Sequence, residues 1–393
     1  MNKEITIKEC CTLFTDGDWI ESKDQSDSGI RLIQTGNIGN GVYLEKKGRA
    51  KYISEETMLR LGCTEVYPGD ILVSRLPDPV GRACIIPPKI ERMITAVDCS
   101  ILRINDEIVD KRYLLCFLNS PCYYKQITSF LAGTTRIRIS RKNLERIIVK
   151  LPVREKQLEI AKRIDLLTSI INLQIKTLNK LDELIKSRFV EMFGDIIHDD
   201  KIPKVVLSEL ANIGSSKRIF ANEYTDEGIP FYRSKEIREL GSGIKPTTEL
   251  FISSERYKSI KDKYGVPKIG DILIAAIGAT IGYSWIVDTD KPFYYKDGNL
   301  ILLSLKDCVN SVFLNHTIGI LIDDFKKRGV SGSAQLALTI EKLEKMPVIN
   351  PSLASQNQFA NFVSQVEKQK VTVRQSIDKL ETLKKSLMQD CFG

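Results

Sequence analysis

The sequence predicts an α+β protein in which two mixed globular domains alternate with two long helices as an internal duplication. Three observations support this prediction. Residue identities repeat at a nearly constant offset, short apolar runs bounded by turn residues fill the first part of each repeat, and a heptad pattern fills the second part. The length of 393 residues agrees with more than one domain, because a domain typically has about 150 residues.

The repeat is clearest in the second part of each copy. Pro152 coincides with Pro351, an offset of 199 residues. The motif that begins at Gly69 (Gly-Asp-Ile-Leu) recurs at Gly270 with an offset of 201, which indicates a short insertion that is later removed. A period of this length is too long for a solenoid and indicates a duplicated module. The offset of 199 also pairs Gln157, Leu181, Leu184, Lys186, Ser187, Phe193 and Gly194 with Gln356, Leu380, Leu383, Lys385, Ser386, Phe392 and Gly393.

Each copy begins with a globular part rich in short strands, predicted over residues 1–150 and 196–350. Runs such as Ile-Leu-Val-Ser after Asp70 are flanked by Gly, Pro and Asp, which is typical of strands. The segment 111–130 predicts a helix that is broken near Pro121. Each first part is therefore expected to be a compact mixed domain.

Each copy ends with a long helix, predicted over residues 151–195 and 351–393. No Pro or Gly interrupts 154–193 or 352–392, and forty helical residues span about 60 Å. Apolar residues recur there in steps of four and three, which predicts a coiled-coil seam. The predicted seam residues are Ile160, Ile164, Leu167, Ile171, Leu178, Leu181, Ile185, Phe359, Val363, Val366, Val373, Ile377, Leu380 and Leu387.

An apolar seam of this length needs a partner, and the other helix of the same chain is always present. We expect the two helices to pair antiparallel, with the two copies related by a pseudo-twofold axis. The same register continues through Arg188 and Met192 in the first helix and through Cys391 in the second. Gln174 and Lys370 interrupt the seam, either to fix its register or as tolerated irregularities.

Composition narrows the class of protein. The net charge of +8, from 58 basic and 50 acidic residues, permits a polyanionic partner without requiring one. The nine cysteines form no Cys-x-x-Cys pair, which favours reduced thiols in a cytoplasmic protein. The two histidines, His198 and His316, argue against zinc hydrolases and Ser-His-Asp hydrolases. We expect no membrane association, because no run of about 18 apolar residues and no signal region are evident.

The duplicated motifs resemble the specificity subunits of Type I restriction–modification systems, and the resemblance covers the whole chain. Each motif is weak alone, but the set occurs in order, twice, with a long helix after each. The second copy lacks the usual Glu before Gln356. The motifs are Leu32-Ile-Gln-Thr-Gly-Asn-Ile, Gly69-Asp-Ile-Leu-Val-Ser-Arg, Val80-Gly-Arg, Gly133-Thr-Thr-Arg, Leu151-Pro-Val-Arg-Glu-Lys-Gln, Gly270-Asp-Ile-Leu-Ile-Ala and Ile281-Gly-Tyr.

The resemblance implies that each globular part is a target-recognition domain that reads one half of a split site in double-stranded DNA. The helices would set the distance between the half-sites and bind two methyltransferase (modification) subunits, and restriction motor subunits would join that core. Half-sites about one helical turn apart do need a rigid spacer. The family's specificity subunit is non-catalytic, and we expect neither a cofactor nor a metal site.

Candidate DNA contacts lie in basic or polar segments after predicted strands. Arginine suits both phosphates and guanine edges, and glutamine suits adenine. Solvated surface charge and ordinary turn chemistry are the alternative interpretations. The candidates in the first domain are Gln34, Thr35, Asn37, Arg75, Arg82, Thr134, Thr135, Arg136, Arg138 and Arg141. Those in the second domain are Arg233, Ser234, Lys235, Lys327, Arg328, Ser333 and Gln335.

Enzymatic motifs are missing from the sequence. It contains neither a Gly-x-x-x-x-Gly-Lys-Ser/Thr phosphate loop nor the Asp/Asn-Pro-Pro-Tyr motif of amino-methyltransferases. The tyrosine pairs at 123–124 and 294–295 are interpreted as packing residues. Two other functions stay open: a coiled-coil adaptor that binds only proteins, and an enzyme with a fused nuclease or methyltransferase.

Overall fold

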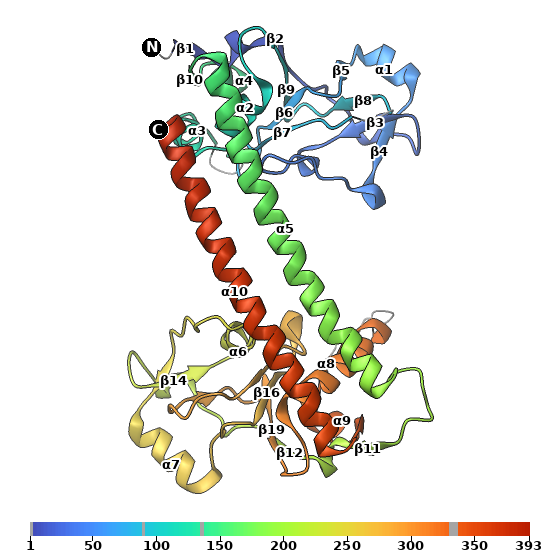
Figure 1. Cartoon of the computed structure of the whole chain (residues 1–393), viewed down its shortest axis with the longest axis vertical. Helices are drawn as coiled ribbons and strands as arrows, with labels where there is room; N and C mark the ends of the chain where they lie inside the picture. The colour runs from blue at the N-terminus through green and yellow to red at the C-terminus, as the bar shows by residue number, and fades with distance from the viewer. Residues whose placement is uncertain (1–2, 89–90, 134–136, 330–336) are drawn as a thin grey trace. The chain divides into compact units, whose positions relative to one another are not determined.

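The computed structural model describes residues 3–88, 91–133, 137–329 and 337–393. The chain forms two compact units (Figure 1). Unit 1 consists of Met1–Thr177 with Val373–Gly393, and unit 2 consists of Leu178–Thr372. The boundaries between the units fall inside the two long helices, so each unit contains one globular domain and one end of each helix.

The main sheet of unit 1 is antiparallel, with the strand order β2-β9-β6-β7. The Gly-Asp-Ile-Leu motif forms the turn that enters β6. Gly69 has a positive φ of 93°, and the Asp70 carboxylate accepts hydrogen bonds from the Tyr67 backbone and the Arg103 guanidinium, both at 2.9 Å. The strands are β2 (Cys11–Asp16), β6 (Ile71–Ser74), β7 (Ala83–Ile85) and β9 (Cys99–Ile104).

A second sheet of unit 1 has the order β4-β3-β8-β5, in which β3 and β8 are parallel. The strands are β3 (Ile30–Ile33), β4 (Lys51–Ile53), β5 (Glu65–Val66) and β8 (Met93–Thr95), and helix α1 (Glu55–Leu61) lies between β4 and β5 in the chain. A separate pair, β1 (Lys3–Thr6) and β10 (Ile148–Leu151), joins the start of the chain to the start of the first long helix.

Unit 2 repeats this topology, which confirms the internal duplication. Its main sheet has the order β12-β19-β16-β17, its second sheet has the order β13-β15-β14-β18, and β14 and β18 are again parallel. The main-sheet strands are β12 (Ala211–Gly214), β16 (Ile272–Ala275), β17 (Ser284–Ile286) and β19 (Leu300–Leu305). The others are β13 (Tyr224–Thr225), β14 (Ile229–Tyr232), β15 (Phe251–Ile252) and β18 (Tyr294–Tyr295), with β11 (Lys204–Val206) paired to β20 (Pro347–Ile349).

The shorter helices follow the predicted punctuation. Helices α2 (Lys111–Phe117) and α3 (Pro121–Ser129) confirm the predicted break, because Pro121 starts α3 and Ser120 caps it. Unit 2 has one continuous helix there, α8 (Ser311–Gly329), with no proline inside it. The remaining short helices are α4 (Arg141–Glu145), α6 (Ser234–Gly241), α7 (Ser254–Tyr264) and α9 (Ile340–Glu344).

The two long helices are α5 (Arg154–Phe193) and α10 (Leu353–Phe392), as predicted. They run antiparallel (green and red in Figure 1). In unit 1, Ile164 near the start of α5 shares a core with Phe392 at the end of α10, and in unit 2 Phe189 near the end of α5 shares a core with Phe359. Every predicted seam residue is buried or half-buried.

The predicted seam register is wrong by one residue near the C-terminal ends of both helices. Phe189 and Phe193 are buried where the heptad register placed Arg188 and Met192, and Phe392 is buried where it placed Cys391. A heptad repeat drifts by about 20° per heptad on a straight α-helix, which amounts to about one residue over five heptads. The ends of the helices therefore turn a different face to the core.

The duplicated glutamines Gln157 and Gln356 connect the start of each long helix to the start of α2 and of α8, respectively. The Gln157 side chain accepts a hydrogen bond from the Asp110 backbone N–H and donates one to the Pro152 carbonyl. Gln356 makes the equivalent bonds to the Asn310 N–H and the Pro351 carbonyl. Both glutamines are buried with their amide groups satisfied, which explains why this residue stands at the same place in both copies.

Lys370 is buried in the helix pair of unit 2. Its ammonium group lies 2.7 Å from Asp182 on α5 and 2.6 Å from Glu367 on α10. Burial alone lowers the pKa of Lys370, but the two carboxylates outweigh burial and raise it above 10.5. Ile171, its counterpart in the first copy, is buried and apolar. The cross-helix ion pair favours a role in register over a tolerated irregularity.

Within the part of the chain that the structure describes, no helix combines the length and the apolar character that crossing a bilayer requires.

We expect Phe392→Ala to destabilise unit 1 by about 3–5 kcal/mol, the usual cost of truncating a buried phenylalanine. The Phe392 ring is 3% exposed, with centroids 5.3 Å from Tyr113 and 5.8 Å from Phe117. Urea unfolding of the full chain measures the effect. Leu383→Ala on the same helix is the control, because Leu383 is 55% exposed. Equal destabilisation by the two variants would contradict the packing described above.

His316 makes the stability of unit 2 dependent on pH. Burial lowers the pKa of His316 below its ordinary value of 6.5, and its charged neighbours Glu367 and Lys370 have opposite effects. The unfolded chain therefore binds the proton first as the pH falls below 6.5, and folding stability decreases there. We expect His316→Gln to reduce the fall in melting temperature between pH 7.5 and pH 5.5. The exposed His198→Gln should leave that fall unchanged.

Candidate nucleic-acid interface

Three loops of unit 1 meet at one edge of its main sheet. They are residues 34–38 after β3, residues 75–82 between β6 and β7, and the described residues 132–133 and 137–139 before α4. The guanidinium of Arg82 donates to carbonyls in the first two loops. The Ile139 N–H donates to the Arg75 carbonyl at 3.3 Å, which ties the third loop to the second. The fold thus brings together the predicted contact segments, which are far apart in the sequence.

The geometry reassigns three of the predicted contact residues to structural roles. Arg82 is 8% exposed and its donors are directed at backbone carbonyls. Arg75 donates to the Val97 carbonyl at 2.6 Å and lies 3.5 Å from Asp16. Asn37 is buried, and its amide bridges the Gln34 N–H and the Leu44 carbonyl. These polar groups make their hydrogen bonds inside the domain, which favours structural roles for the three residues over direct contact with DNA.

Other predicted residues of unit 1 do lie at the surface. Arg138 is exposed, and a backbone bridge to Ala132 closes the base of its loop. Arg141 at the start of α4 is exposed and lies 3.4 Å from Glu145. Gln34 and Thr35 are half-buried in the turn after β3. The candidates Thr134, Thr135 and Arg136 lie outside the described residues.

Unit 2 builds the corresponding edge with one equivalent backbone hydrogen bond and with a different bridge. A bridge joins Ile277 to Ala337, and the Leu338 N–H donates to the Ala276 carbonyl at 2.9 Å. This bond is the counterpart of the one from Ile139 to Arg75. The candidates Ser333 and Gln335 lie outside the described residues.

The remaining candidates of unit 2 come from two helices. Arg233 precedes α6 and contacts the fully buried Glu236 at 3.2 Å, while Ser234 starts that helix. Lys235 is half-buried and donates to the Thr247 carbonyl at 3.3 Å. Lys327 and Arg328 are exposed in the last turn of α8, where cations also stabilise the helix dipole, and Arg328 pairs with Asp324.

The structure adds basic residues that the sequence interpretation missed. Lys46 is exposed, and its ammonium group lies directly beside Gly36 in the turn after β3. Arg49 is exposed in the 3-10 turn that follows. In unit 2, the Lys217 ammonium lies 5.4 Å from the centre of the Tyr264 ring, and Arg218 pairs with Asp297 at 2.7 Å. The cluster of basic residues at 46–51 could have been recognised in the sequence. The contact between Lys217 and Tyr264 is evident only in the folded structure.

A family model described as the type I restriction modification DNA specificity domain matches the chain twice, over residues 2–183 and 200–382. The chain belongs to this family. The two matches coincide with the two copies of the repeat, so each unit of this specificity protein carries one edge of the kind described above.

Relatives and solved structures agree with that assignment. A putative type I restriction enzyme specificity subunit of Haemophilus influenzae is 29% identical over 64% of this chain and 65% of its own length. The putative MjaX specificity subunit of Methanocaldococcus jannaschii is 24% identical over 94% of this chain and 87% of its own.

Two solved structures share the fold at 16% identity. A chain from a study of the assembly and conformational transition of the type I R-M system has a TM-score of 0.62, with 99% of this chain and 97% of that chain covered. The S subunit from M. genitalium has a TM-score of 0.53, with 100% and 96% covered.

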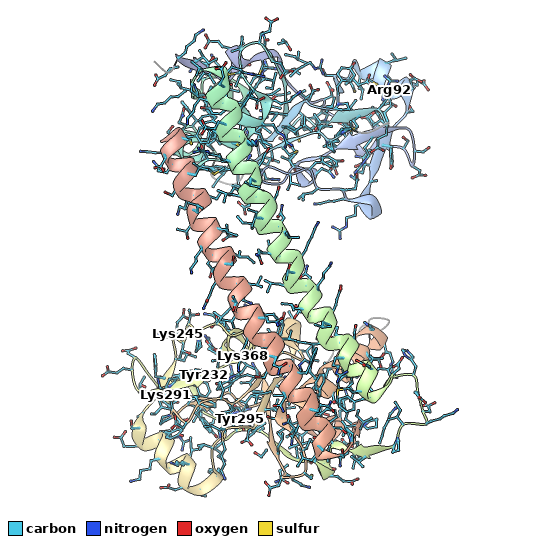
Figure 2. All side chains as sticks on the ribbon, in the orientation of Figure 1. Arg92, Tyr232, Lys245, Lys291, Tyr295 and Lys368 are labelled. Atoms are coloured by element: carbon cyan, nitrogen blue, oxygen red, sulfur yellow. The ribbon has the colours of Figure 1, made fainter. Side chains whose placement is uncertain are left out.

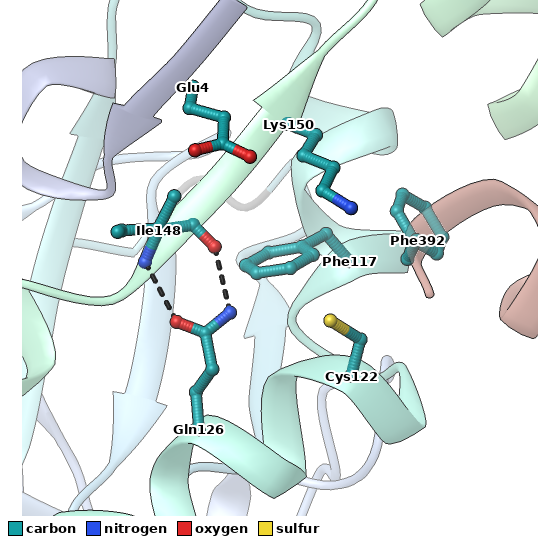
Figure 3. Close-up of a pocket in the computed structure, with 7 residues that line it drawn as sticks. All are labelled: Glu4, Phe117, Cys122, Gln126, Ile148, Lys150 and Phe392. Carbon is teal, nitrogen blue, oxygen red and sulfur yellow. Dashed lines mark hydrogen bonds between the residues drawn. The ribbon is translucent and has the colours of Figure 1, made fainter. Parts of the chain in front are cut away.

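Two cavities of unit 1 are lined partly by the long helices. A cavity of about 260 Å³ in unit 1 lies between Phe117 and Phe392, and the Gln126 amide closes it by pairing with both backbone groups of Ile148 (Figure 3). A larger cleft of about 680 Å³, also in unit 1, lies between the α2–α3 segment and the two long helices. Within the described ranges, no cluster of His, Cys, Asp and Glu has the arrangement of a metal site.

Four of the nine cysteines, Cys10, Cys84, Cys99 and Cys116, are buried, whereas Cys308 is exposed. Burial raises the pKa of Cys84 and Cys99 to about 12, so their thiols stay protonated near neutral pH. All nine cysteines are free.

Proposed function

We propose that this chain is the DNA-specificity subunit of a type I restriction–modification complex and that each unit reads one half of a split target in double-stranded DNA. The observation that carries the proposal is the double match to the DNA specificity domain on two units with the same strand order. The loop edge of each unit is the proposed contact surface, since base edges are read by side chains that reach into a groove.

The two edges carry different side chains, which favours an asymmetric target. In unit 1 the exposed residues include Arg138, Arg141 and Lys46, whereas unit 2 presents Lys327 in the last turn of α8. We propose that Arg136, Thr134 and Thr135 join the first edge and that Ser333 and Gln335 join the second. Much of the affinity would come from phosphate contacts and would fall steeply with salt.

The proposal includes protein partners on the long helices. On α5, Leu158, Leu166 and Leu173 are 48%, 60% and 64% exposed and lie on one helix face. Exposed apolar stripes of this kind mark protein interaction sites. We propose that two methyltransferase subunits dock on the paired helices and that motor subunits join them, in the cytoplasm. The chain itself would act without a cofactor and without catalysis.

The decisive experiment is the genome-wide methylation pattern of the host with and without this gene. The proposal expects that deletion removes methylation from one split motif and leaves other motifs unchanged. Retention of every motif would contradict it and would favour an adaptor. DNA binding by the purified chain at low and high salt then separates the two, because an adaptor without DNA affinity shows no salt-dependent DNA binding.

Replacing Arg136 and Arg138 by Ala should weaken DNA binding and relax recognition of one half-site. If both residues bind phosphates, the slope of log affinity against log salt should become shallower by about one for each arginine replaced. Binding titrations at several salt concentrations measure the slope. Arg163→Ala on α5 removes an exposed charge away from the loop edge and should leave the slope unchanged. Unaltered methylation of both half-sites by the double variant would argue against a role of these arginines in DNA binding.

Removing two heptads from α5 should change the spacer of the target or abolish assembly. Fourteen helical residues correspond to about 21 Å, which is more than half a turn of DNA. The methylation motif of a host that carries the shortened gene gives the result. An unchanged spacer with full activity would refute the proposal that the helices set the distance.

A further inference from the structure

Arg82 lies at a position where the backbone conformation is the same in both units but the side chain differs. Its counterpart is Tyr283. The Ser74 N–H donates to the Arg82 carbonyl at 2.9 Å, and the Ala275 N–H donates to the Tyr283 carbonyl at 2.8 Å. The glycine before each residue has a positive φ and donates back to the same strand, from Gly81 to Ser74 and from Gly282 to Ala275, both at 2.8 Å. The two side chains therefore leave equivalent hairpins.

The Arg82 side chain connects two recognition loops of unit 1. Its Nε donates to the Ile38 carbonyl at 2.7 Å and its Nη2 to the Thr35 carbonyl at 2.9 Å. Its Nη1 donates to the Leu76 and Pro79 carbonyls at 2.9 and 3.1 Å. The planar guanidinium offers donors in a fixed geometry, so four carbonyls on two loops are held at defined positions.

The Arg82 side chain with its four carbonyl partners, called the arginine clamp below, is held by carbonyl dipoles. Among the described residues no carboxylate forms an ion pair with Arg82, although the side chain is 8% exposed. The guanidinium places a positive charge beneath the loop edge. A buried charged group of this kind is costly unless its hydrogen bonds are made, and the four bonds make the two loops interdependent.

Unit 2 fixes the corresponding segment differently. Tyr283 is 46% exposed and reaches no loop carbonyl of the described residues with its ring. The segment after β14 instead forms α6, whose last residue Gly241 lies directly against the Ser284 carbonyl of β17 without space for a Cβ atom. Helix packing thus replaces the arginine clamp.

We infer that Arg82 is a positioning residue that pre-organises the recognition loops of unit 1, and that Tyr283 has no such role in unit 2. This inference depends on the proposed function, because it assumes that the loop edge reads DNA. Loops ordered before binding cost less to immobilise in the complex, and a wrong base is rejected only where the contacting groups are held in place. Removal of the clamp should therefore reduce discrimination at one half-site and leave the other unaffected.

The test is the methylome of the host with the variant genes in place of the wild type. Arg82→Tyr introduces the residue of unit 2, and Arg82→Lys keeps the charge but not the planar fork. We expect methylation of sites with one mismatch in one half, the same half for both variants, to rise about tenfold relative to cognate sites, which is the usual penalty of one mismatch. Sites with a mismatch in the other half should stay unmethylated.

Two controls separate positioning from general stability. Arg92 lies near α1 and β5 at the far sheet of unit 1 (Figure 2) and pairs with Glu55 and Glu65, both at 2.8 Å. Arg92→Ala removes a structural arginine that touches neither loop. This variant should not increase methylation of sites with a mismatch in either half. Tyr283→Ala should likewise leave the half-site affected by Arg82 unchanged.

The outcomes distinguish this inference from the proposed function. Wild-type specificity in both Arg82 variants, or an equal loss at both half-sites in parallel with lower protein levels, overturns the positioning role while a split motif still supports the proposed function. If Arg82→Tyr abolishes folding, the pattern of Arg82→Lys alone decides. A host without any split motif that depends on this gene would instead defeat the proposed function itself.

Discussion

The structure depends on the exchange of helix ends between the two copies of the repeat. Helix α5 follows the first domain in sequence, yet its last turns are buried in unit 2, where Phe193 lies 5.0 Å from Phe313 between ring centres. Helix α10 follows the second domain and ends in unit 1 with Phe392 against Tyr113. Neither domain therefore has a complete core without a helix from the other copy. Association is intramolecular, so the apolar seam is covered without a second chain.

The polar contacts add specificity to this exchange. Gln157 and Gln356 attach the start of each helix to its own domain by the same pair of hydrogen bonds. Lys370 joins α10 to Asp182 on α5 in unit 2, whereas the equivalent place in unit 1 is taken by Ile171. Asp182 is the partner on the opposite helix, so a slipped register would separate it from Lys370 and leave only Glu367, on the same helix as Lys370, to pair with the buried ammonium.

Duplication also explains how one fold presents two different surfaces. The strand order, the glycine turns at Gly69 and Gly270 and the bonds that anchor the loop edges recur in both units. The units differ in their loop side chains and in the means of fixing the loops, which are Arg82 in one unit and the packing of α6 in the other. A common frame with variable edges suits a protein whose two halves recognise different sequences.

The sequence by itself determined the duplication, the strand-rich domains, both long helices and their apolar seam. These features follow from local rules: proline and glycine bound the helices, and the heptad spacing selects one helix face. The family was also readable, because its motifs recur in order in both copies. The exact buried face at the helix ends was not, since the drift between the 3.5 and 3.6 repeats accumulates over the length of the helix.

Only the tertiary structure decided which candidate residues are available for contact. The sequence suggested DNA contact for Arg82, Arg75 and Asn37 because of their residue types. The fold directs their polar groups at carbonyls and N–H groups inside unit 1. Lys46 had no such prediction and lies beside the same turn. Hydrogen bonds between residues forty positions apart have no local sequence signal, because their donors and acceptors meet only after the strands have paired.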